Sequence, residues 1–83
     1  MINVLVTESG GPAAIGLIKT IKKSKYKAKV YAVDANKLSA GNLLADEGIT
    51  VPLASDEEYL LELLKIVVNK KIHLIIPTGE HDL

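Results

Sequence analysis

A glycine-rich turn is the first place in this 83-residue sequence where residue types and spacing could do chemistry. Gly10, Gly11 and Pro12 follow the apolar run 2–6, and a helical pattern starts directly after them. Backbone N–H groups of such a turn, together with the start of a helix, can bind the phosphates of a nucleotide. A dinucleotide-binding turn has glycine at three places, G-x-G-x-x-G. Here the chain reads G-P-A-A-I-G, with alanine at the middle place.

The charged residues near the turn give opposing indications about dinucleotide binding. Asp34 follows the second apolar run, close to where a ribose-binding acid would sit. Glu8 lies in the turn itself, however, and its carboxylate would repel a pyrophosphate. Gly16 falls opposite the apolar stripe of its helix, so it does not serve close packing on a sheet. Three hypotheses stay open: NAD or NADP binding, a turn that only reverses the chain, and an anionic or amino-bearing substrate near the backbone of 9–13.

Other functional classes lack the residues that they need. The sequence has no cysteine, which excludes thiolate metal sites and a thiol nucleophile. Its two histidines, His73 and His81, lack metal-ligand spacing, so we expect no metal site. The phosphate-binding pattern G-x-x-x-x-G-K-[ST] and a Ser-His-Asp arrangement are both missing, and we assign no catalytic residue. A receiver-like regulatory domain would need an acidic pair after the first strand, where the chain offers only Glu8.

The amino-acid composition limits the kinds of partner that the protein can bind. Ten basic residues balance ten acidic ones, and the only aromatic residues are three tyrosines. A neutral chain with so few aromatic side chains offers neither a phosphate-binding patch nor a stacking platform, so we expect no nucleic acid. The start of the chain has no basic region and no long apolar run, which predicts neither a signal peptide nor a membrane span. We therefore expect a cytoplasmic protein.

The elements that must position the turn follow from the hydrophobic pattern. Apolar runs predict strands at 2–6, 28–34, 49–53 and 73–77. A helix should begin at Pro12 and bury a stripe of four side chains: Ala14, Leu17, Ile18 and Ile21. A short helix is predicted within 38–48.

The last predicted helix has the clearest start signal in the sequence. Ser55 and Glu58 have the spacing of a capping box, and Lys70 and Lys71 would close the positive end. Its apolar stripe is predicted to consist of Leu60, Leu63, Leu64 and Val67.

This order predicts an α/β protein with a parallel sheet covered on both faces. Right-handed crossovers put the first two helices on one face and the last helix on the other. The expected fold is a Rossmann-like three-layer α/β/α arrangement with four parallel strands in the order 3-2-1-4. Ligands of such sheets bind at the carboxyl ends of the strands. We therefore expect substrate-side or domain-interface residues there: Glu8, Ser9, Gly10, Gly11, Asp34, Thr78, Gly79 and Glu80. Gly11 in particular is expected to need a positive φ or a close approach.

Three motifs resemble the N-terminal pre-ATP-grasp domain of carbamoyl-phosphate-synthase-like ATP-grasp proteins. They are the turn G-G-P-A-x-I-G at 10–16, the segment D-A-N-x-x-S-A-G-x-x-L-A-D at 34–46 and the closing I-I-P-T-G-E at 75–80. The similarity covers essentially the whole chain. It implies a Rossmann-like domain that does not itself bind a nucleotide and carries no cofactor.

The resemblance also implies a function for the parent protein. In such ligases ATP and Mg²⁺ lie in a downstream ATP-grasp domain, where a carboxylate is phosphorylated and then attacked by an amine or similar nucleophile. Residues 1–83 would form one pre-ATP-grasp domain, a fragment whose ATP-grasp partner lies in the same or a split chain. Alone it should be inactive, contributing loops that face a small-molecule substrate. The open edge beside the fourth strand would be covered by a longer chain or a homodimer. The alternative is a truncated NAD(P)-binding domain of an oxidoreductase or epimerase.

Overall fold

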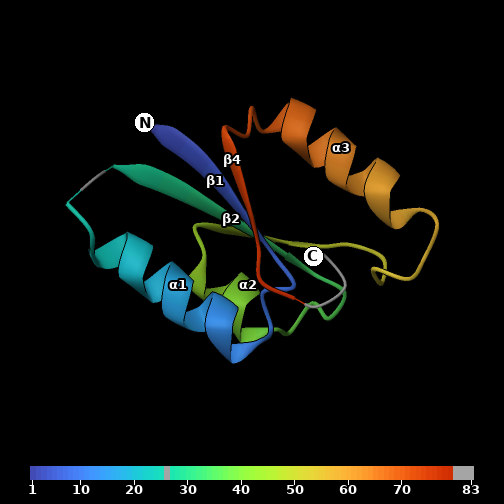
Figure 1. The fold of residues 1–83 in the computed structure, drawn as a ribbon, viewed down its shortest axis with the longest axis horizontal. Coiled ribbons are helices and arrows are strands. Elements are labelled where there is room, and N and C mark those ends of the chain that lie inside the picture. Colours follow the sequence, from blue (N-terminus) through green and yellow to red (C-terminus); the bar gives the residue numbers. More distant parts are fainter. Residues whose placement is uncertain (26, 80–83) are drawn as a thin grey trace.

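The computed structural model describes residues 1–25 and 27–79 as four strands and three helices around one sheet (Figure 1). In chain order the elements are β1 (Ile2–Thr7), α1 (Pro12–Lys23), β2 (Ala28–Asp34), α2 (Ala40–Leu44), β3 (Glu47–Thr50), α3 (Tyr59–Asn69) and β4 (Leu74–Pro77). All neighbouring strands are parallel, and their order is β3-β2-β1-β4. The predicted fold class and strand order are therefore confirmed.

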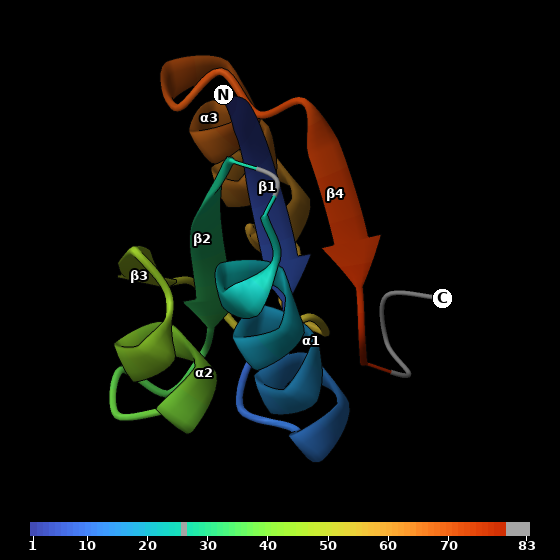
Figure 2. The same cartoon turned by 90° about the vertical axis from the view of Figure 1, so that its left-hand side faces the viewer.

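The two faces of the sheet carry two separate cores because successive side chains of a strand point to opposite faces. On one face, Val4 and Val6 of β1 pack with Ala14 and Ile18 of α1. On the other face, Leu5 packs with residues of β2 and with Ile66 of α3. Figure 2 shows α1 and α2 together in front of the sheet and α3 behind it. The predicted placement of the helices is confirmed.

Helix α1 follows its sequence signals closely. Proline occupies the start of the helix, and Lys22 and Lys23 lie in its last turn, where positive charge is favourable. The predicted stripe faces the sheet: Ala14 and Ile18 are buried, and Leu17 and Ile21 pack against the same core. A Cβ atom added at Gly16 would meet nothing within 4 Å, as its place opposite the stripe predicts.

The predicted capping box of α3 is wrong. The helix begins at Tyr59 rather than beside Ser55, and no side chain caps it. The Asp56 side chain instead accepts a hydrogen bond from the Glu58 backbone N–H (2.8 Å), which closes a turn before the helix starts. The stripe shifts with this later start. The residues that face the sheet are Tyr59, Leu63, Ile66 and Val67, while Leu60 and Leu64 are exposed.

Smaller differences concern element ends. α2 is shorter than the predicted 38–48, and β3 starts two residues before the predicted 49–53. The side chain of Ser39 caps α2 by accepting a hydrogen bond from the Asn42 backbone N–H, which sets where the helix begins. Within the described parts of the chain, none of the helices is both long and apolar enough to cross a membrane.

Candidate functional site

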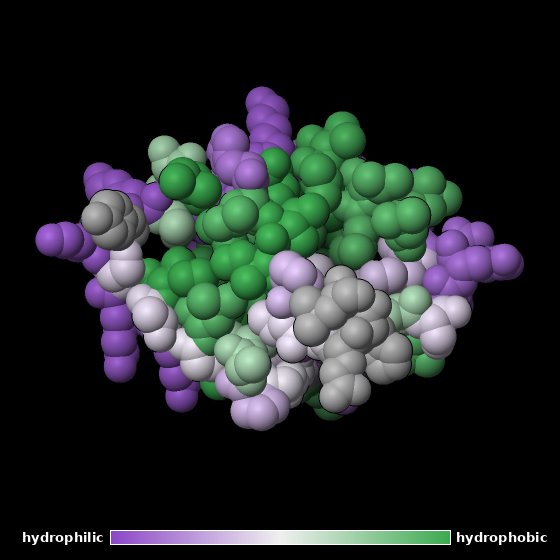
Figure 3. Space-filling view, viewed as in Figure 1, coloured by the Kyte–Doolittle hydropathy of each residue, from purple (hydrophilic) through white to green (hydrophobic). Residues whose placement is uncertain are grey.

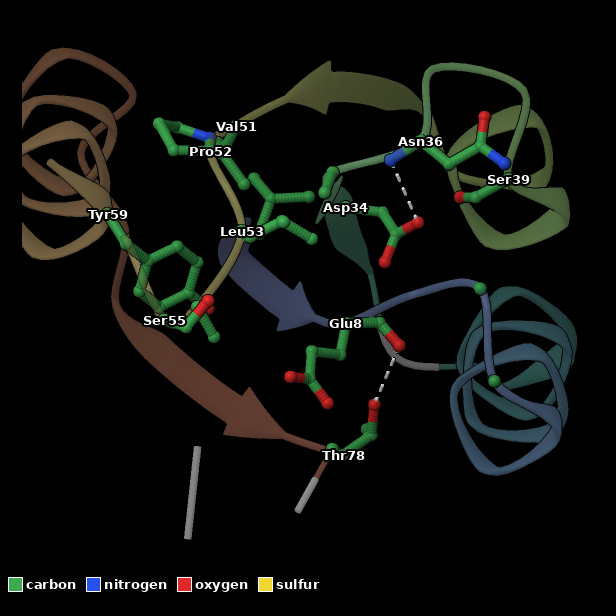
Figure 4. A pocket seen from close by; sticks show the side chains of 16 residues that line it. Glu8, Asp34, Asn36, Ser39, Val51, Pro52, Leu53, Ser55, Tyr59 and Thr78 are labelled. Carbon is green, nitrogen blue, oxygen red and sulfur yellow. Dashed lines mark hydrogen bonds between the residues drawn. The ribbon is translucent and has the colours of Figure 1, made fainter. Parts of the chain in front are cut away.

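A cleft of about 660 Å³ lies at the edge of the sheet where the strands end (Figure 4). Its walls come from the loops after β1, β2, β3 and β4, because parallel strands place all of their carboxyl ends at one edge. The described residues that line it are Glu8, Gly10, Gly11, Val33, Asp34, Ala35, Asn36, Ser39, Val51, Pro52, Leu53, Ala54, Ser55, Tyr59, Thr78 and Gly79.

The loops after β1 and β4 meet at Glu8. The Thr78 hydroxyl donates a hydrogen bond to the Thr7 carbonyl oxygen (2.7 Å) and lies 3.4 Å from the Glu8 carbonyl oxygen. Gly79 lies directly against the Glu8 side chain, where an added Cβ atom would overlap the carboxylate. Glu8 has a φ of 48°, a left-handed conformation that costs a non-glycine residue roughly 1–2 kcal/mol. The fold therefore holds this carboxylate at the cleft at an energetic cost.

Asp34 places a second carboxylate in the cleft at the end of β2. Its Oδ2 accepts a hydrogen bond from the Asn36 backbone N–H (3.2 Å), which fixes the side chain beside the turn. Gly10 allows the β1 loop to approach it, because a Cβ atom added at Gly10 would lie only 3.2 Å from Asp34 Oδ2. Gly10 thus supports the geometry of the cleft by lacking a side chain.

Ser9 does not line the cleft, although the sequence grouped it with the loop residues. Its side chain is fully buried behind the wall, where its hydroxyl bonds to Ser39 Oγ (3.1 Å) and to Asn42 Oδ1 (2.5 Å). Gly41 of α2 packs on the Ser9 backbone so closely that an added Cβ atom would overlap the Ser9 carbonyl oxygen. Ser9 therefore ties the β1 loop to α2.

The expectation that Gly11 needs a positive φ or a close approach is wrong. Its φ is −80°, and a Cβ atom added there would meet only the Glu8 carbonyl oxygen, at 3.9 Å. The left-handed residue of this turn is Glu8 instead. Glu80, the last residue of the predicted set, lies outside the described residues.

Sequence reasoning missed one whole wall of the cleft. Val51, Leu53 and Tyr59, from the segment after β3 and the start of α3, face the two carboxylates from across the opening (Figure 4). The strand order could have pointed to this wall, because β3 also ends at this edge of the sheet. The loop after it contains no glycine or charged residue before Asp56 that would have drawn attention.

The charge of the cleft is one-sided. Among the described lining residues two are acidic, Glu8 and Asp34, and none is basic. Lys37 lies outside it, in a neighbouring shallower hollow with Thr50 and Leu53. In the described part of the chain, no three histidine, cysteine or acidic residues come together in a way that could hold a metal ion. The arrangement suits a cationic group next to an apolar stem.

This geometry can be compared with known families. The family model described as PylC-like, N-terminal domain, matches residues 4–83 and thus nearly the whole chain. The chain belongs to this family. It is a pre-ATP-grasp-type domain of ATP-grasp family proteins, which confirms the resemblance seen in the motifs. No curated protein matches the chain closely enough to count as a relative.

The glycine turn of this PylC-like domain departs from a dinucleotide fingerprint in two ways. Gly16 is exposed on α1, and a Cβ atom added there would meet nothing within 4 Å, so it does not perform the helix-packing role of the third fingerprint glycine. The Glu8 carboxylate lines the cleft beside this turn, and its charge would repel a pyrophosphate. The turn places Glu8 and Gly10 at the cleft, and α1 begins directly after it.

Proposed function

We propose that this domain is the substrate-side part of an ATP-grasp ligase and that its cleft receives the amino-bearing substrate. The observation that carries the proposal is the pair Glu8 and Asp34 in a cleft whose described lining has no basic side chain. Carboxylates bind an ammonium group through charge-assisted hydrogen bonds, whereas they repel phosphate and carboxylate groups. Of the two substrate types that the turn left open, the lining favours the amino-bearing one.

The two carboxylates would act by position. The Asn36 backbone N–H holds the Asp34 carboxylate, and the Thr78 hydroxyl holds the backbone at Glu8 through the carbonyl oxygens of Thr7 and Glu8. An ammonium group held between them would place its aliphatic stem along the exposed side chain of Leu53. In the parent enzyme ATP supplies the phosphoryl group that activates a carboxylate. The amine then loses a proton and attacks the acyl carbon, with phosphate as the leaving group.

The parent is proposed to be a cytoplasmic enzyme of carbamoyl-phosphate-synthase-like type. The carbamoyl-phosphate-synthase-like type is supported by the segment D-A-N-x-x-S-A-G-x-x-L-A-D, which spans Asp34 and α2. ATP and Mg²⁺ would be held by the downstream ATP-grasp domain in the same or a split chain. The cleft of this domain would then supply orientation and charge, and no cofactor.

Binding to the 83-residue chain tests the proposal directly. We expect n-butylamine, added at millimolar concentration at pH 7, to shift the amide NMR signals of Gly10, Asn36 and Leu53. Inorganic phosphate, ATP and NAD should not shift them below millimolar concentration. Glu8→Gln and Asp34→Asn should each weaken amine binding about tenfold or more, since a hydrogen bond to a charged group contributes about 1.5–3 kcal/mol.

A matched variant separates the cleft from general surface charge. Glu57→Gln removes one carboxylate of an exposed residue that does not line the cleft, and it should leave amine binding unchanged. Equal weakening by Glu57→Gln would mean non-specific attraction. Micromolar NAD binding at the same amides would instead favour the alternative, a truncated NAD(P)-binding domain.

A further inference from the structure

Three buried polar side chains meet behind the wall of the cleft. Ser9 lies in the loop after β1, Ser39 caps α2, and Asn42 lies within α2. All three are buried, and Ser9 completely so. Buried polar groups are costly unless each of their hydrogen-bonding atoms finds a partner. We call these three residues the Ser9 network.

The hydrogen bonds of the Ser9 network form a closed ring with one direction. The Asn42 side chain donates through Nδ2 to the Ile49 carbonyl oxygen (3.1 Å), so its Oδ1 is the atom left to accept. The Ser9 hydroxyl donates its single proton to that Oδ1 (2.5 Å). Ser39 must then donate to Ser9 Oγ (3.1 Å), and Ser39 Oγ accepts from the Asn42 backbone N–H (3.2 Å). Each member therefore depends on the other two.

Close contacts hold the network from both sides. A Cβ atom added at Gly41 of α2 would overlap the Ser9 carbonyl oxygen, and one added at Gly48 of β3 would overlap the Asn42 backbone. α2 is thus wedged between the β1 loop and β3 without space for a further side chain. Since such close packing resists displacement, the position of α2 determines the position of Ser9.

Glu8 is the residue that this position of Ser9 strains. Its two neighbours, Thr7 and Ser9, are both buried. The Ser9 backbone N–H also bonds to the Val33 carbonyl oxygen (3.1 Å), so the chain is held directly after Glu8. Glu8 joins its neighbours with a φ of 48°, which a non-glycine residue keeps only where its surroundings over-determine it. Burial of Ser9 in the ring supplies such a constraint.

The network also borders the second carboxylate of the cleft. A Cβ atom added at Gly10 would lie 3.4 Å from Ser39 Cβ and 3.2 Å from Asp34 Oδ2. The β1 loop therefore passes between α2 and Asp34 at van der Waals distance from both. A shift of the loop away from α2 would change how the two carboxylates face each other.

We propose that Ser9, Ser39 and Asn42 are positioning residues for the cleft, because their ring holds Glu8 left-handed and so directs its carboxylate into the opening (Figure 4). Ser9 and Asn42 do not line the cleft and act through Glu8. The conformation of Glu8 depends on the ring whatever the cleft binds, whereas the effect of the ring on amine affinity rests on the proposed function.

The contact with β4 is the competing cause of the Glu8 conformation. The Thr78 hydroxyl bonds to the Thr7 carbonyl oxygen and lies 3.4 Å from that of Glu8. Both contacts are only partly buried, so water can take the place of this hydroxyl. Water has no such access to the fully buried Ser9. The ring is therefore expected to dominate, and Thr78→Val becomes the variant that separates the two causes.

NMR spectroscopy of the 83-residue chain tests the conformation. A positive φ brings the amide proton of a residue close to its own Hα, so Glu8 should give a strong cross-peak between these protons. Asn42→Ala leaves the Ser9 hydroxyl buried without its acceptor, and turning Ser9 out to water frees Glu8 to adopt a negative φ. We expect this cross-peak to weaken about twofold or more in Asn42→Ala and to stay strong in Thr78→Val. Ser9→Ala makes a smaller change and should act in the same direction.

Amine affinity is the second readout. Asn42→Ala should raise the Kd for n-butylamine, followed at the Leu53 amide, about fivefold or more, although it removes no cleft side chain. The double variant Ser9→Ala/Asn42→Ala should bind no more weakly than the weaker of the two single variants, since both break one ring. Ile18→Val, which destabilises the apolar core on α1, is the matched control and should leave the Kd and the Glu8 cross-peak unchanged.

An internal signal separates the cleft from other apolar surface. Figure 3 shows apolar side chains gathered over β4 and α3, where the butyl stem can also make contact. Val68, exposed near the end of α3, does not line the cleft. Its amide reports such contact and should respond equally in every variant.

The cross-peaks decide between the possible outcomes. A strong Glu8 cross-peak that persists in folded Asn42→Ala and Ser9→Ala would overturn the proposal. So would a weak cross-peak in the unmodified chain, a measurement that needs no variant. Loss of the cross-peak in Thr78→Val would assign the conformation to β4, and equal loss in Ile18→Val would mean general loosening. If the unmodified chain binds no n-butylamine, the proposed function fails, and the cross-peaks still show whether the ring positions Glu8.

Discussion

At the scale of single residues, Gly41 of α2 packs closely on the backbone of Ser9. A Cβ atom at residue 41 would overlap the Ser9 carbonyl oxygen, and the Ser9 side chain has no room to retreat because it is fully buried. We predict that Gly41→Ala lowers the free energy of unfolding by about 1–3 kcal/mol. Urea unfolding followed by circular dichroism measures the change.

Gly16→Ala is the matched control for that substitution. It makes the same change within a helix, but the added methyl group would meet no atom within 4 Å. It should therefore raise the free energy of unfolding by about 0.5–1 kcal/mol, since alanine has the higher helix propensity. An unchanged free energy of unfolding in Gly41→Ala would mean that α2 packs on the β1 loop loosely enough to accept a methyl group at residue 41.

The glycines also show what the sequence could and could not predict at this scale. The turn at Gly10 and Gly11 was predictable, because glycines after a buried strand indicate a chain reversal. The sequence could not predict which position needs a glycine, because this need depends on atoms that are distant in the sequence. Gly41 is constrained by Ser9, Gly10 by Asp34, and Gly11 by very little.

At the scale of elements, the start of α3 depends on Asp56. The Asp56 Oδ1 accepts a hydrogen bond from the Glu58 backbone N–H, while Ser55 makes no cap. We predict that Asp56→Ala lowers the free energy of unfolding by about 0.5 kcal/mol, the lower end for a side chain that satisfies a backbone N–H near a helix start. Ser55→Ala should leave it unchanged. The opposite ranking in denaturant unfolding would restore the capping box.

A second element contact joins β1 to the connection between α3 and β4. The Asn3 amide donates hydrogen bonds to the carbonyl oxygens of Lys70 (3.0 Å) and Lys71 (3.2 Å). In Asn3→Asp a carboxylate would face these two acceptors without a proton to donate. We predict a loss of about 1–3 kcal/mol in the free energy of unfolding at pH 7, measured by urea titration. Asn36→Asp, at the exposed edge of the cleft, is the control and should change stability much less.

The type and order of the elements were predictable because β1, β2 and β4 are short apolar runs, β3 overlaps the apolar run 49–53, and each long helix has an apolar stripe. The ends of the helices were less predictable. The spacing of Ser55 and Glu58 fits a capping box, but a turn closed by the Leu53 carbonyl oxygen and the Asp56 N–H (2.8 Å) delays the helix. Local spacing does not reveal which of two competing hydrogen-bonding patterns the chain adopts.

At the scale of the whole molecule, the topology unites residues that are distant in the sequence. Glu8, Asp34 and Thr78 meet because parallel strands end at one edge, and this part of the site followed from the predicted strand order. The wall of Val51, Leu53 and Tyr59 did not follow from the sequence, since nothing in an apolar segment after a strand shows that part of it, including the core residue Val51, also lines a cleft. Charged and glycine residues draw attention in a sequence, whereas the apolar part of a cleft becomes visible only in three dimensions.

The proposed parent ligase would allow the roles of its two domains to be measured separately. If this domain orients the amine while ATP is held elsewhere, Glu8→Gln and Asp34→Asn should each raise the KM for the amine substrate about tenfold or more. The KM for ATP should stay within about twofold, because losing a charge-assisted hydrogen bond acts only on the group that it holds. Steady-state kinetics with each substrate varied in turn measures both constants, and Glu57→Gln should change neither. A parallel rise in both constants would mean that the two carboxylates support the contact between domains and do not bind the amine.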